Sequence, residues 1–362
     1  MDDLSERQMQ ILQAIILNYL ETAEPVGSRT ISRHSPLGLS SATIRNEMAD
    51  LEELGFIIQP HTSAGRIPSS KGYRLYVDHL LQSGRMPDED ETRVLAALLK
   101  DKSHQLDALL KELGQLLSVL TQYTTVVTMP QLKRTKLKHL QLIPLDESSV
   151  ILVIVTDGNI VRNHVLKVER ALSQTESGRL SQVLNRNLQG LTMEEINLPV
   201  IQKMRRELGA DQDMVTGLLD AIQATVQYAD DVELYATGTT NILNFPEFSD
   251  ITRARALMEV FQRKDEMLQA IGDIHGLGPG QNLRITIGTE NELEPMQDCS
   301  VVTTSYSVGG RNIGSISVIG PVRMDYGKVI STLGHMMQDF QKMLRGEEDA
   351  FRPPGIPRQD DQ

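Results

Sequence analysis

Small side chains and two bidentate hydrogen-bonding side chains share one face of a helix-like stretch near the N-terminus. Over residues 41–54, a step of about 100° per residue turns Ala42, Asn46 and Ala49 away from the apolar side. Thr43 and Arg45 flank that face. Small residues allow close approach, and Asn and Arg make bidentate contacts to adenine and guanine edges in the major groove. We therefore predict base reading by Arg45 and Asn46, with the other three residues in close contact with the bases.

The local signals around this face are those of a helix with one buried side. Ser40 or Ser41 can accept a hydrogen bond from an N–H group that the first turn leaves unpaired. Gly55 occupies the position where helices commonly end in a left-handed residue. Acidic residues are concentrated in the C-terminal half. A DNA-facing helix would therefore contact the DNA with its N-terminal half, as recognition helices do. The apolar stripe at i, i+4 and i+7 is Ile44, Met48 and Leu51.

A β-like run and a basic turn follow this helix. Residues 56–59 are strand-like, residues 60–65 form a turn, and Arg66-Ile67 returns. Upstream, Ser5 and Gln8 form a capping box, and a break at residues 25–27 precedes a short helix. This order predicts a winged helix-turn-helix with its wing on the phosphate backbone; the alternative is a helix followed by an unrelated hairpin. The candidates for phosphate contact are Ser28, Arg29, Ser40, Ser41, His61, Thr62, Ser63, Arg66, Lys71 and Arg74.

Composition argues against a protein that coats nucleic acid nonspecifically. The 362 residues carry a formal net charge of −12, and this length suggests two or three domains. Between residues 27 and 76, basic residues outnumber acidic ones only slightly, so sequence-specific contacts must carry much of the affinity.

The chain is expected to be soluble and cytoplasmic. Its single cysteine, Cys299, excludes an intramolecular disulfide and is typical of a reducing cytosol. The N-terminal residues MDDLSERQ lack the basic region and apolar core of a signal peptide. The longest strongly apolar run, residues 150–155, is far shorter than the ~20 residues that span a bilayer and predicts a buried strand instead.

No constellation of residues indicates an enzyme, a metal site or a cofactor. The eight histidines are scattered and have no cysteine partner for zinc. The glycines of residues 276–280 follow a helix and lack the Lys and Ser/Thr of a phosphate loop, so a plain loop is predicted. Gly309-Gly310 is typical of a tight hairpin. For Cys299, simple packing is favoured over redox sensing.

Beyond the N-terminal region, the pattern predicts an α+β arrangement. Leucines between residues 95 and 120 recur at helical spacing, which is more typical of a core face than of a dimer seam. Strand-like runs follow from residue 124 to residue 169, and others begin near residue 283. A mostly helical block lies between them, including one helix over residues 251–271. Strands on both sides of a helical block suggest one domain interrupted by another.

The chain resembles the HrcA family of bacterial heat-inducible transcription repressors. Three N-terminal blocks carry the resemblance: PVGSRTIS (25–32), LGLSSATIRNEMADLEELGFI (37–57) and HTSAGRIPSSKGYRLYVD (61–78). Two later blocks are also similar, GTTNILNFPEF (238–248) and GGRNIGSISVIGP (309–321). The resemblance covers nearly the whole chain and implies a non-enzymatic repressor that needs no cofactor.

This resemblance also implies a domain arrangement. A winged helix-turn-helix would precede a GAF-like antiparallel-sheet domain, which a mainly helical inserted dimerisation domain interrupts. We accordingly predict five segments: the winged-helix domain with its following helix at 1–84, a linker or helix at 85–104, the GAF-like domain at 105–188 and 273–346, the insert at 189–272, and a disordered tail at 347–362.

The partners implied by the resemblance are double-stranded DNA, a second copy of the chain and the GroE chaperonin. A homodimer would bind an inverted-repeat operator upstream of chaperone and chaperonin operons, and the chaperonin would keep it active. One rival has the GAF-like domain sense a small molecule, which needs convergent polar groups in a cavity. A second rival is an enzyme that uses the winged helix for protein interaction.

Overall fold

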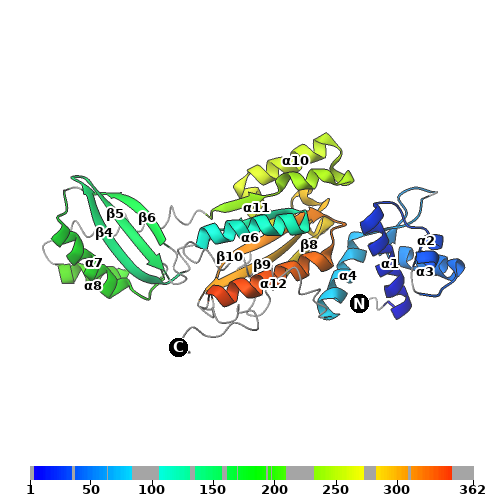
Figure 1. The fold of residues 1–362 in the computed structure, drawn as a ribbon, viewed down its shortest axis with the longest axis horizontal. Helices are drawn as coiled ribbons and strands as arrows, with labels where there is room; N and C mark the ends of the chain where they lie inside the picture. The colour runs from blue at the N-terminus through cyan, green and yellow to red at the C-terminus, as the bar shows by residue number, and fades with distance from the viewer. Residues whose placement is uncertain are drawn as a thin grey trace, which may run out of the picture.

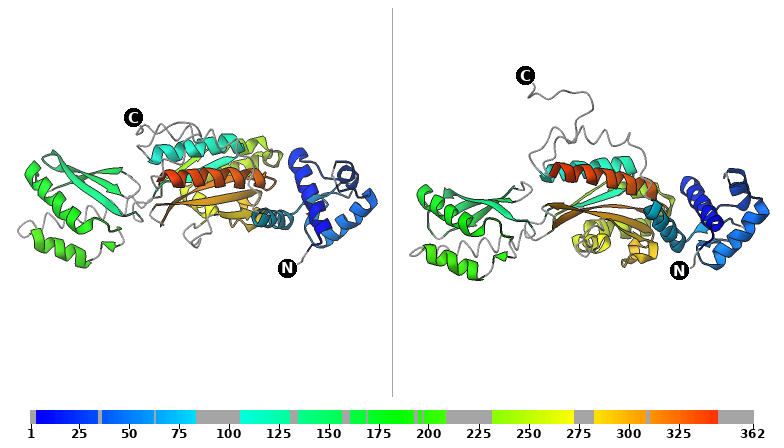
Figure 2. Two further views of the ribbon diagram at one scale, coloured as in Figure 1. Left: turned by 60° about the horizontal axis from the view of Figure 1, so that its bottom comes forward. Right: turned by 90° about the horizontal axis from the view of Figure 1, so that it is seen from below.

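Three bodies in a row make up the described part of the chain (Figure 1). We call them the head (residues 4–83), the body (106–130 and 232–344) and the insert (135–208). The head and the insert lie at opposite ends of the body in all views (Figure 2). The computed structural model describes residues 4–34, 37–62, 64–83, 106–130, 135–156, 161–168, 170–192, 195–196, 198–208, 232–272, 283–308 and 311–344.

The head is a winged helix built on three helices, a two-stranded wing and a fourth helix. Its elements are α1 (Glu6–Thr22), α2 (Ser28–His34), α3 (Ser41–Glu53), β1 (Ile57–Ile58), β2 (Ile67–Pro68) and α4 (Ser70–Ser83). The predicted capping box begins α1, with the Gln8 N–H donating to Ser5 Oγ at 3.2 Å and the Ser5 N–H donating to Gln8 Oε1 at 3.0 Å. One side of α1 packs against α3, and the core of the head includes Ile11, Leu12, Ile15, Ile16, Ile44 and Leu51.

A five-stranded antiparallel sheet with both faces covered forms the body. The strand order is β7-β3-β10-β9-β8, and helices α6 and α12 cover one face while α10 and α11 cover the other (Figure 2). The strands are β3 (Thr124–Thr128), β7 (Leu234–Thr237), β8 (Leu283–Ile287), β9 (Cys299–Val308) and β10 (Arg311–Pro321). The helices are α6 (Leu106–Thr121), α10 (Ile251–Gln262), α11 (Lys264–Ile271) and α12 (Tyr326–Leu344), with the short 3-10 helices η5 (Thr239–Asn244), η6 (Pro246–Phe248), η7 (Gly288–Glu290) and η8 (Glu294–Met296).

The insert is a three-stranded antiparallel sheet with helices on one face only. Its elements are β4 (Leu137–Asp146), β5 (Ser149–Thr156), β6 (Val161–Lys167), α7 (Gln174–Leu188) and α8 (Leu198–Leu208), in the strand order β4-β5-β6. Alternate residues of β5 are buried, because Val150, Leu152 and Ile154 join the core formed with α7 and α8. The other face of this sheet has no helix over it among the described residues (Figure 2).

The structure divides the chain at different places from the predicted boundaries. Strands β4 to β6 and helix α7, which the predicted boundaries placed in the first half of the sheet domain, form the insert's own sheet and its cover. Strand β7 and helices α10 and α11, which were assigned to the insert, belong to the body. Periodicity identifies strands but carries no information on which strands pair. The predicted domain boundaries therefore differ from those in the structure. The predicted linker at 85–104 and tail at 347–362 lie outside the described residues.

Other local predictions can be compared directly. The predicted helix over residues 251–271 is two helices, because Arg263 is extended with φ −96° and ψ 111° between α10 and α11. Buried leucines on α6 confirm the prediction of a core face: Leu106, Leu109, Leu110, Leu113 and Leu117. None of the described helices is long and apolar enough to cross a membrane.

Candidate nucleic-acid interface

Helix α3 presents the predicted base-reading residues at the surface of the head. Ala42, Arg45, Asn46 and Ala49 are exposed, and Thr43 is half-buried. The opposite side of the helix is fixed in the core, because Ile44, Met48 and Leu51 are at most 5% exposed. Arg45 and Asn46 have no side-chain hydrogen bond within the described part of the chain. Their polar groups are therefore available to an external partner.

The N-terminus of α3 is closed by the predicted cap. Ser40 Oγ accepts a hydrogen bond from the Thr43 N–H at 3.1 Å and lies 2.9 Å from Thr43 Oγ1. Ser41 is the first helical residue and is half-buried. The positive end of the helix dipole lies here, which favours a nearby phosphate. At the other end Gly55 has φ +78°, so the predicted left-handed residue is confirmed.

Acidic residues in the second half of α3 are partly neutralised inside the head. Glu47 Oε1 lies 3.4 Å from Arg7 Nη1 of α1. Glu52 Oε2 accepts hydrogen bonds from Arg66, with distances of 2.8 Å to Nε and 2.7 Å to Nη2. The second pair joins α3 to the wing, so the two candidate DNA-binding elements are fixed to each other.

The wing is short and its tip is held by side-chain hydrogen bonds. β1 pairs with β2, and Arg66 also exchanges backbone hydrogen bonds with Val26 at 2.8 and 2.9 Å. Gly65 is required here, since a Cβ atom would lie 2.5 Å from the Val26 carbonyl oxygen. Gln59 Nε2 donates to the carbonyl oxygens of Thr62 and Ala64, both at 3.1 Å.

These contacts leave the tip of the wing in solvent. The predicted phosphate contacts His61 and Thr62 are exposed there. Ser63 lies outside the described residues.

Three of the remaining candidates for phosphate contact also lie on the head surface. Arg29 is exposed on α2, whose first residue, Ser28, is half-buried. Lys71 is exposed, but its Nζ donates to the Leu54 carbonyl oxygen at 3.0 Å and lies 4.5 Å from the centre of the Phe56 ring. Phosphate contact by these residues, and by Arg66 in its pair with Glu52, stays a prediction.

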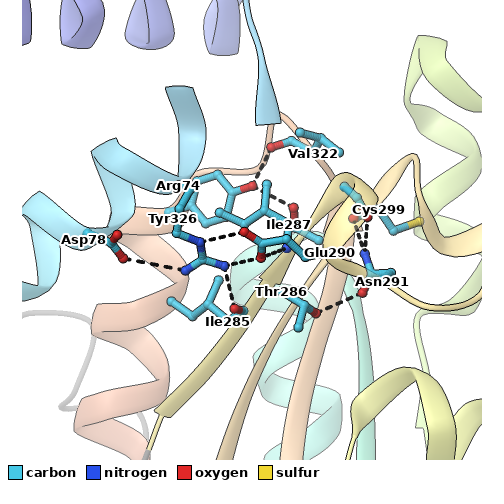
Figure 3. A network of polar contacts seen from close by, with 12 residues as sticks. Arg74, Asp78, Ile285, Thr286, Ile287, Glu290, Asn291, Cys299, Val322 and Tyr326 are labelled. Atoms are coloured by element: carbon cyan, nitrogen blue, oxygen red, sulfur yellow. Dashed lines mark hydrogen bonds and ion pairs between the residues drawn. The ribbon is translucent and has the colours of Figure 1, made fainter. Parts of the chain in front are cut away.

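Arg74 differs from the other candidates because it lies where the head meets the body (Figure 3). Its Nε donates to Glu290 Oε1 at 2.8 Å, and its Nη2 donates to the Ile285 carbonyl oxygen at 2.7 Å and to Glu290 Oε2. Asp78 lies 3.6 Å from Nη1 on the same helix. The hydrogen bonds to Glu290 raise the pKa of Arg74. Phosphate contact stays a prediction for Arg74 too, although its guanidinium already has these partners.

Sequence reasoning missed the body residues that hold the head. Glu290 receives Arg74, and its Oε2 also accepts a hydrogen bond from the Ile287 N–H at 2.8 Å. Arg323 Nη1 donates to the Leu20 carbonyl oxygen of α1 at 3.1 Å, while Nε donates to Glu247. The sequence did contain one indication of these contacts. Glu247 lies in the 238–248 block, which resembles the HrcA family but for which the sequence predicted no function.

The buried titratable groups of the body include the thiol of Cys299. Cys299 is fully buried, in keeping with the predicted packing role, and burial raises the pKa of its thiol. Within the described ranges, no three His, Cys, Asp or Glu residues are grouped so that they could hold a metal ion.

Comparison with protein families matches nearly the whole chain. The family described as "Winged helix-turn-helix transcription repressor, HrcA DNA-binding" matches residues 3–79. The family described as "HrcA protein C terminal domain" matches residues 107–330. The first match contains α3 and the wing, and the second contains the insert and most of the body.

Individual relatives agree with these matches. The heat-inducible transcription repressor HrcA of Lachnoclostridium phytofermentans is 42% identical over 346 residues, which is 96% of this chain and 99% of that protein. The protein of the same name from Clostridium perfringens is 38% identical over 95% of this chain and 100% of its own length. That from Alkaliphilus metalliredigens is 41% identical over 95% and 99%.

A solved structure shares the fold over most of the chain. It is a crystal structure of a hypothetical protein, 26% identical, which superposes with a TM-score of 0.63 over 95% of this chain and 99% of that chain.

Proposed function

The chain belongs to the HrcA family of heat-inducible transcription repressors, and from this premise we propose that it represses chaperone and chaperonin operons by binding an inverted-repeat operator as a homodimer. Each head of the dimer would place the N-terminal half of α3 in the major groove of one half-site. This activity would take place in the cytoplasm, where the operator DNA is.

One observation carries the proposal: the exposed face of α3 is made of small residues around Arg45 and Asn46, whose side chains have no internal hydrogen bond within the described part of the chain. A solvated helix face ordinarily carries long charged side chains. Here Ala42 and Ala49 leave room for base pairs to approach, and the two bidentate side chains can then reach base edges. Ser40, Ser41, Arg29 and the exposed wing tip would contact the flanking phosphates.

The insert supplies a surface suited to dimerisation. Six aliphatic residues lie on the sheet face opposite α7 and α8: Ile143, Ile151, Val153, Val155, Val161 and Val165. Ile151 pairs in register with Ile143 on one side and Val165 on the other, which makes an unbroken apolar row across three strands. Val165 is 63% exposed and Val161 is 50% exposed. An exposed apolar patch of this kind is typical of an interaction surface.

We assign this face to a second copy of the chain. Two identical faces related by a two-fold axis would cover each other, and a two-fold protein matches an inverted repeat. Family resemblance adds the GroE chaperonin as the partner that maintains the activity of the repressor.

A footprint of the full-length protein on its own chaperone promoters tests the proposal. We expect two symmetric protected half-sites on one inverted repeat, and stronger protection when purified GroE chaperonin is added. Protection of a single half-site would overturn the proposal that the repressor binds as a dimer. If no sequence is protected, the proposal that it binds an operator in these promoters is wrong. Equal protection with and without chaperonin would remove GroE from the proposal. A copurifying small molecule that changes the footprint would favour a ligand-sensing regulator instead.

A further inference from the structure

Two arginine contacts cross between the head and the body at separate places. The first is made by Arg74 of α4, which reaches Glu290 and the backbone of β8 (Figure 3). Because the Ile285 carbonyl oxygen and the Glu290 carboxylate lie at the same edge of the body sheet, one guanidinium binds both the strand and the turn that follows it. This geometry fixes the orientation of Arg74 as well as its position.

The second contact runs in the opposite direction, from the body to the head. Arg323 Nη1 donates to the Leu20 carbonyl oxygen at 3.1 Å. Leu20 lies in the last turn of α1, where carbonyl groups have no partner within the helix and a positive charge is favoured by the helix dipole. Glu247 and the Phe245 ring, 5.5 Å from the guanidinium carbon, hold Arg323 in place. Arg323 thus caps a helix of the head from the body.

Close packing between the head and the body accompanies these contacts. Tyr73 of α4 is 1% exposed and its ring centre lies 5.7 Å from that of Tyr326, which is completely buried at the start of α12. Gly288 allows a close approach, since a Cβ atom there would lie 2.4 Å from Ser70 Oγ. We call the two arginine contacts and this packing the latch.

The latch holds two different helices of the head, so it restricts rotation as well as separation. Helices α1 and α4 both pack in the core that supports α3. The recognition helix therefore has a defined direction relative to the body, while its DNA-facing side remains exposed.

We propose that the latch sets the half-site spacing that the dimer accepts, with Glu290 and Arg323 as positioning residues for operator specificity. This inference rests on the proposed binding of an inverted repeat by a homodimer. Each added base pair moves the second half-site by about 3.4 Å and rotates it by roughly a tenth of a turn. Two heads held rigidly can meet only one such spacing, whereas two loosened heads can follow several.

The test compares operators that differ only in the number of base pairs between the half-sites. The variant is Glu290→Gln combined with Arg323→Gln, which removes the body side of both contacts and changes no residue proposed to touch DNA. The matched control is Arg263→Gln, which breaks an ion pair of similar length, 2.7 Å to Glu266, within the body. Affinities are measured by fluorescence anisotropy for the promoter's own inverted repeat, for spacers changed by roughly one to five base pairs, and for a single half-site.

The expected result is a change in spacing preference alone. Wild type and Arg263→Gln should lose at least about 10-fold in affinity when the spacer changes, because the second head can no longer bind at high effective concentration. The double variant should lose less than about 3-fold over the same set and bind the single half-site as wild type does. An unchanged spacing preference in the double variant overturns the inference. If wild type binds one half-site as tightly as the inverted repeat, the proposed function itself is wrong.

Loss of folding in the double variant would be detected by circular dichroism. In that case, the single variants Glu290→Gln and Arg323→Gln take its place, since each retains the other contact. Each should lose less affinity than wild type when the spacer changes. A preference equal to wild type in both folded single variants would count against the latch.

Discussion

The exposed faces of α3 and of the insert sheet differ in the side chains that they offer to a partner. Both belong to amphipathic elements whose other side is buried, with Ile44 and Leu51 beneath α3 and Leu152 and Ile154 beneath the insert sheet. The face of α3 carries alanines, an asparagine and an arginine. The face of the insert sheet carries mainly valine and isoleucine. The first is suited to hydrogen bonding with bases, and the second to burial against another apolar surface.

This difference predicts that the two proposed interactions, DNA binding by the head and dimerisation by the insert, are separable. Helix α3 and the insert sheet lie at opposite ends of the described part of the molecule, with the body between them (Figure 1). A change at one end should therefore alter one interaction directly and reach the other only through the dimer or through the body. The following variants test that separation.

The largest effect is expected from Val165→Glu in the insert. A carboxylate within this apolar interface would be buried without a partner, so the dimer should dissociate. Operator affinity should then fall by about 100-fold or more, because the second head loses its effective concentration. Sedimentation velocity measures the dimer, and anisotropy measures the operator affinity.

Val119→Glu is the matched control, since Val119 is also an exposed valine, 65% exposed on α6. It should leave the dimer intact. A stable dimer of Val165→Glu would assign the two-fold contact to another surface.

Asn46→Ala comes next and acts at the other end of the molecule. Losing a bidentate base contact should cost roughly 1–3 kcal/mol and relax the preference at one base position, with the dimer unchanged. A selection from randomised half-sites gives the base preference. Asn244→Ala, a change at an exposed asparagine of the body, is the control. If both the operator affinity and the base preference are unchanged, Asn46 does not contact bases.

Arg74→Ala distinguishes the two tasks that this residue could have. Since Glu290 and the Ile285 carbonyl oxygen already bind its guanidinium, we expect a broader spacing preference, as for the latch variants. A phosphate contact would instead lower the slope of log affinity against log salt by about one. The salt dependence on a single half-site separates these outcomes.

The smallest effect is expected from Arg29→Ala on the head surface. Its exposed side chain is placed for a phosphate, so the loss should weaken all DNA sequences alike and lower the salt slope by about one. Base preference and dimerisation should not change. Competition between operator and random DNA measures this, and a selective loss of operator binding would show that Arg29 reads sequence.

Local predictions from the sequence were accurate where nearby residues decide the outcome. The stripe of Ile44, Met48 and Leu51 is buried, the Ser5–Gln8 capping box forms, and Gly55 is left-handed. Each of these features depends on contacts within one or two helical turns. The candidate base-reading residues could also be placed on one helix face from the sequence, because helical spacing alone determines which residues share a face.

Predictions failed where residues far apart in the chain must meet. β3 pairs with β7 and with β10, which both follow the insert in the chain, and period-two alternation does not distinguish these partners from β4 or β5. Arg74 stays a candidate for phosphate contact, but its ion pair with the body was not predicted. Its contact with Glu290 joins residues 216 positions apart, which no local pattern indicates.

The sequence by itself determined the family, the winged helix and the composition of the α3 face, since these follow from residue types at short spacing. Only the tertiary structure decided which strands form the insert, which face of its sheet the described helices leave uncovered and how the head is held on the body. The physical reason is that burial and long-range pairing are properties of the packed chain as a whole, because a side chain's exposure depends on what other segments bring against it.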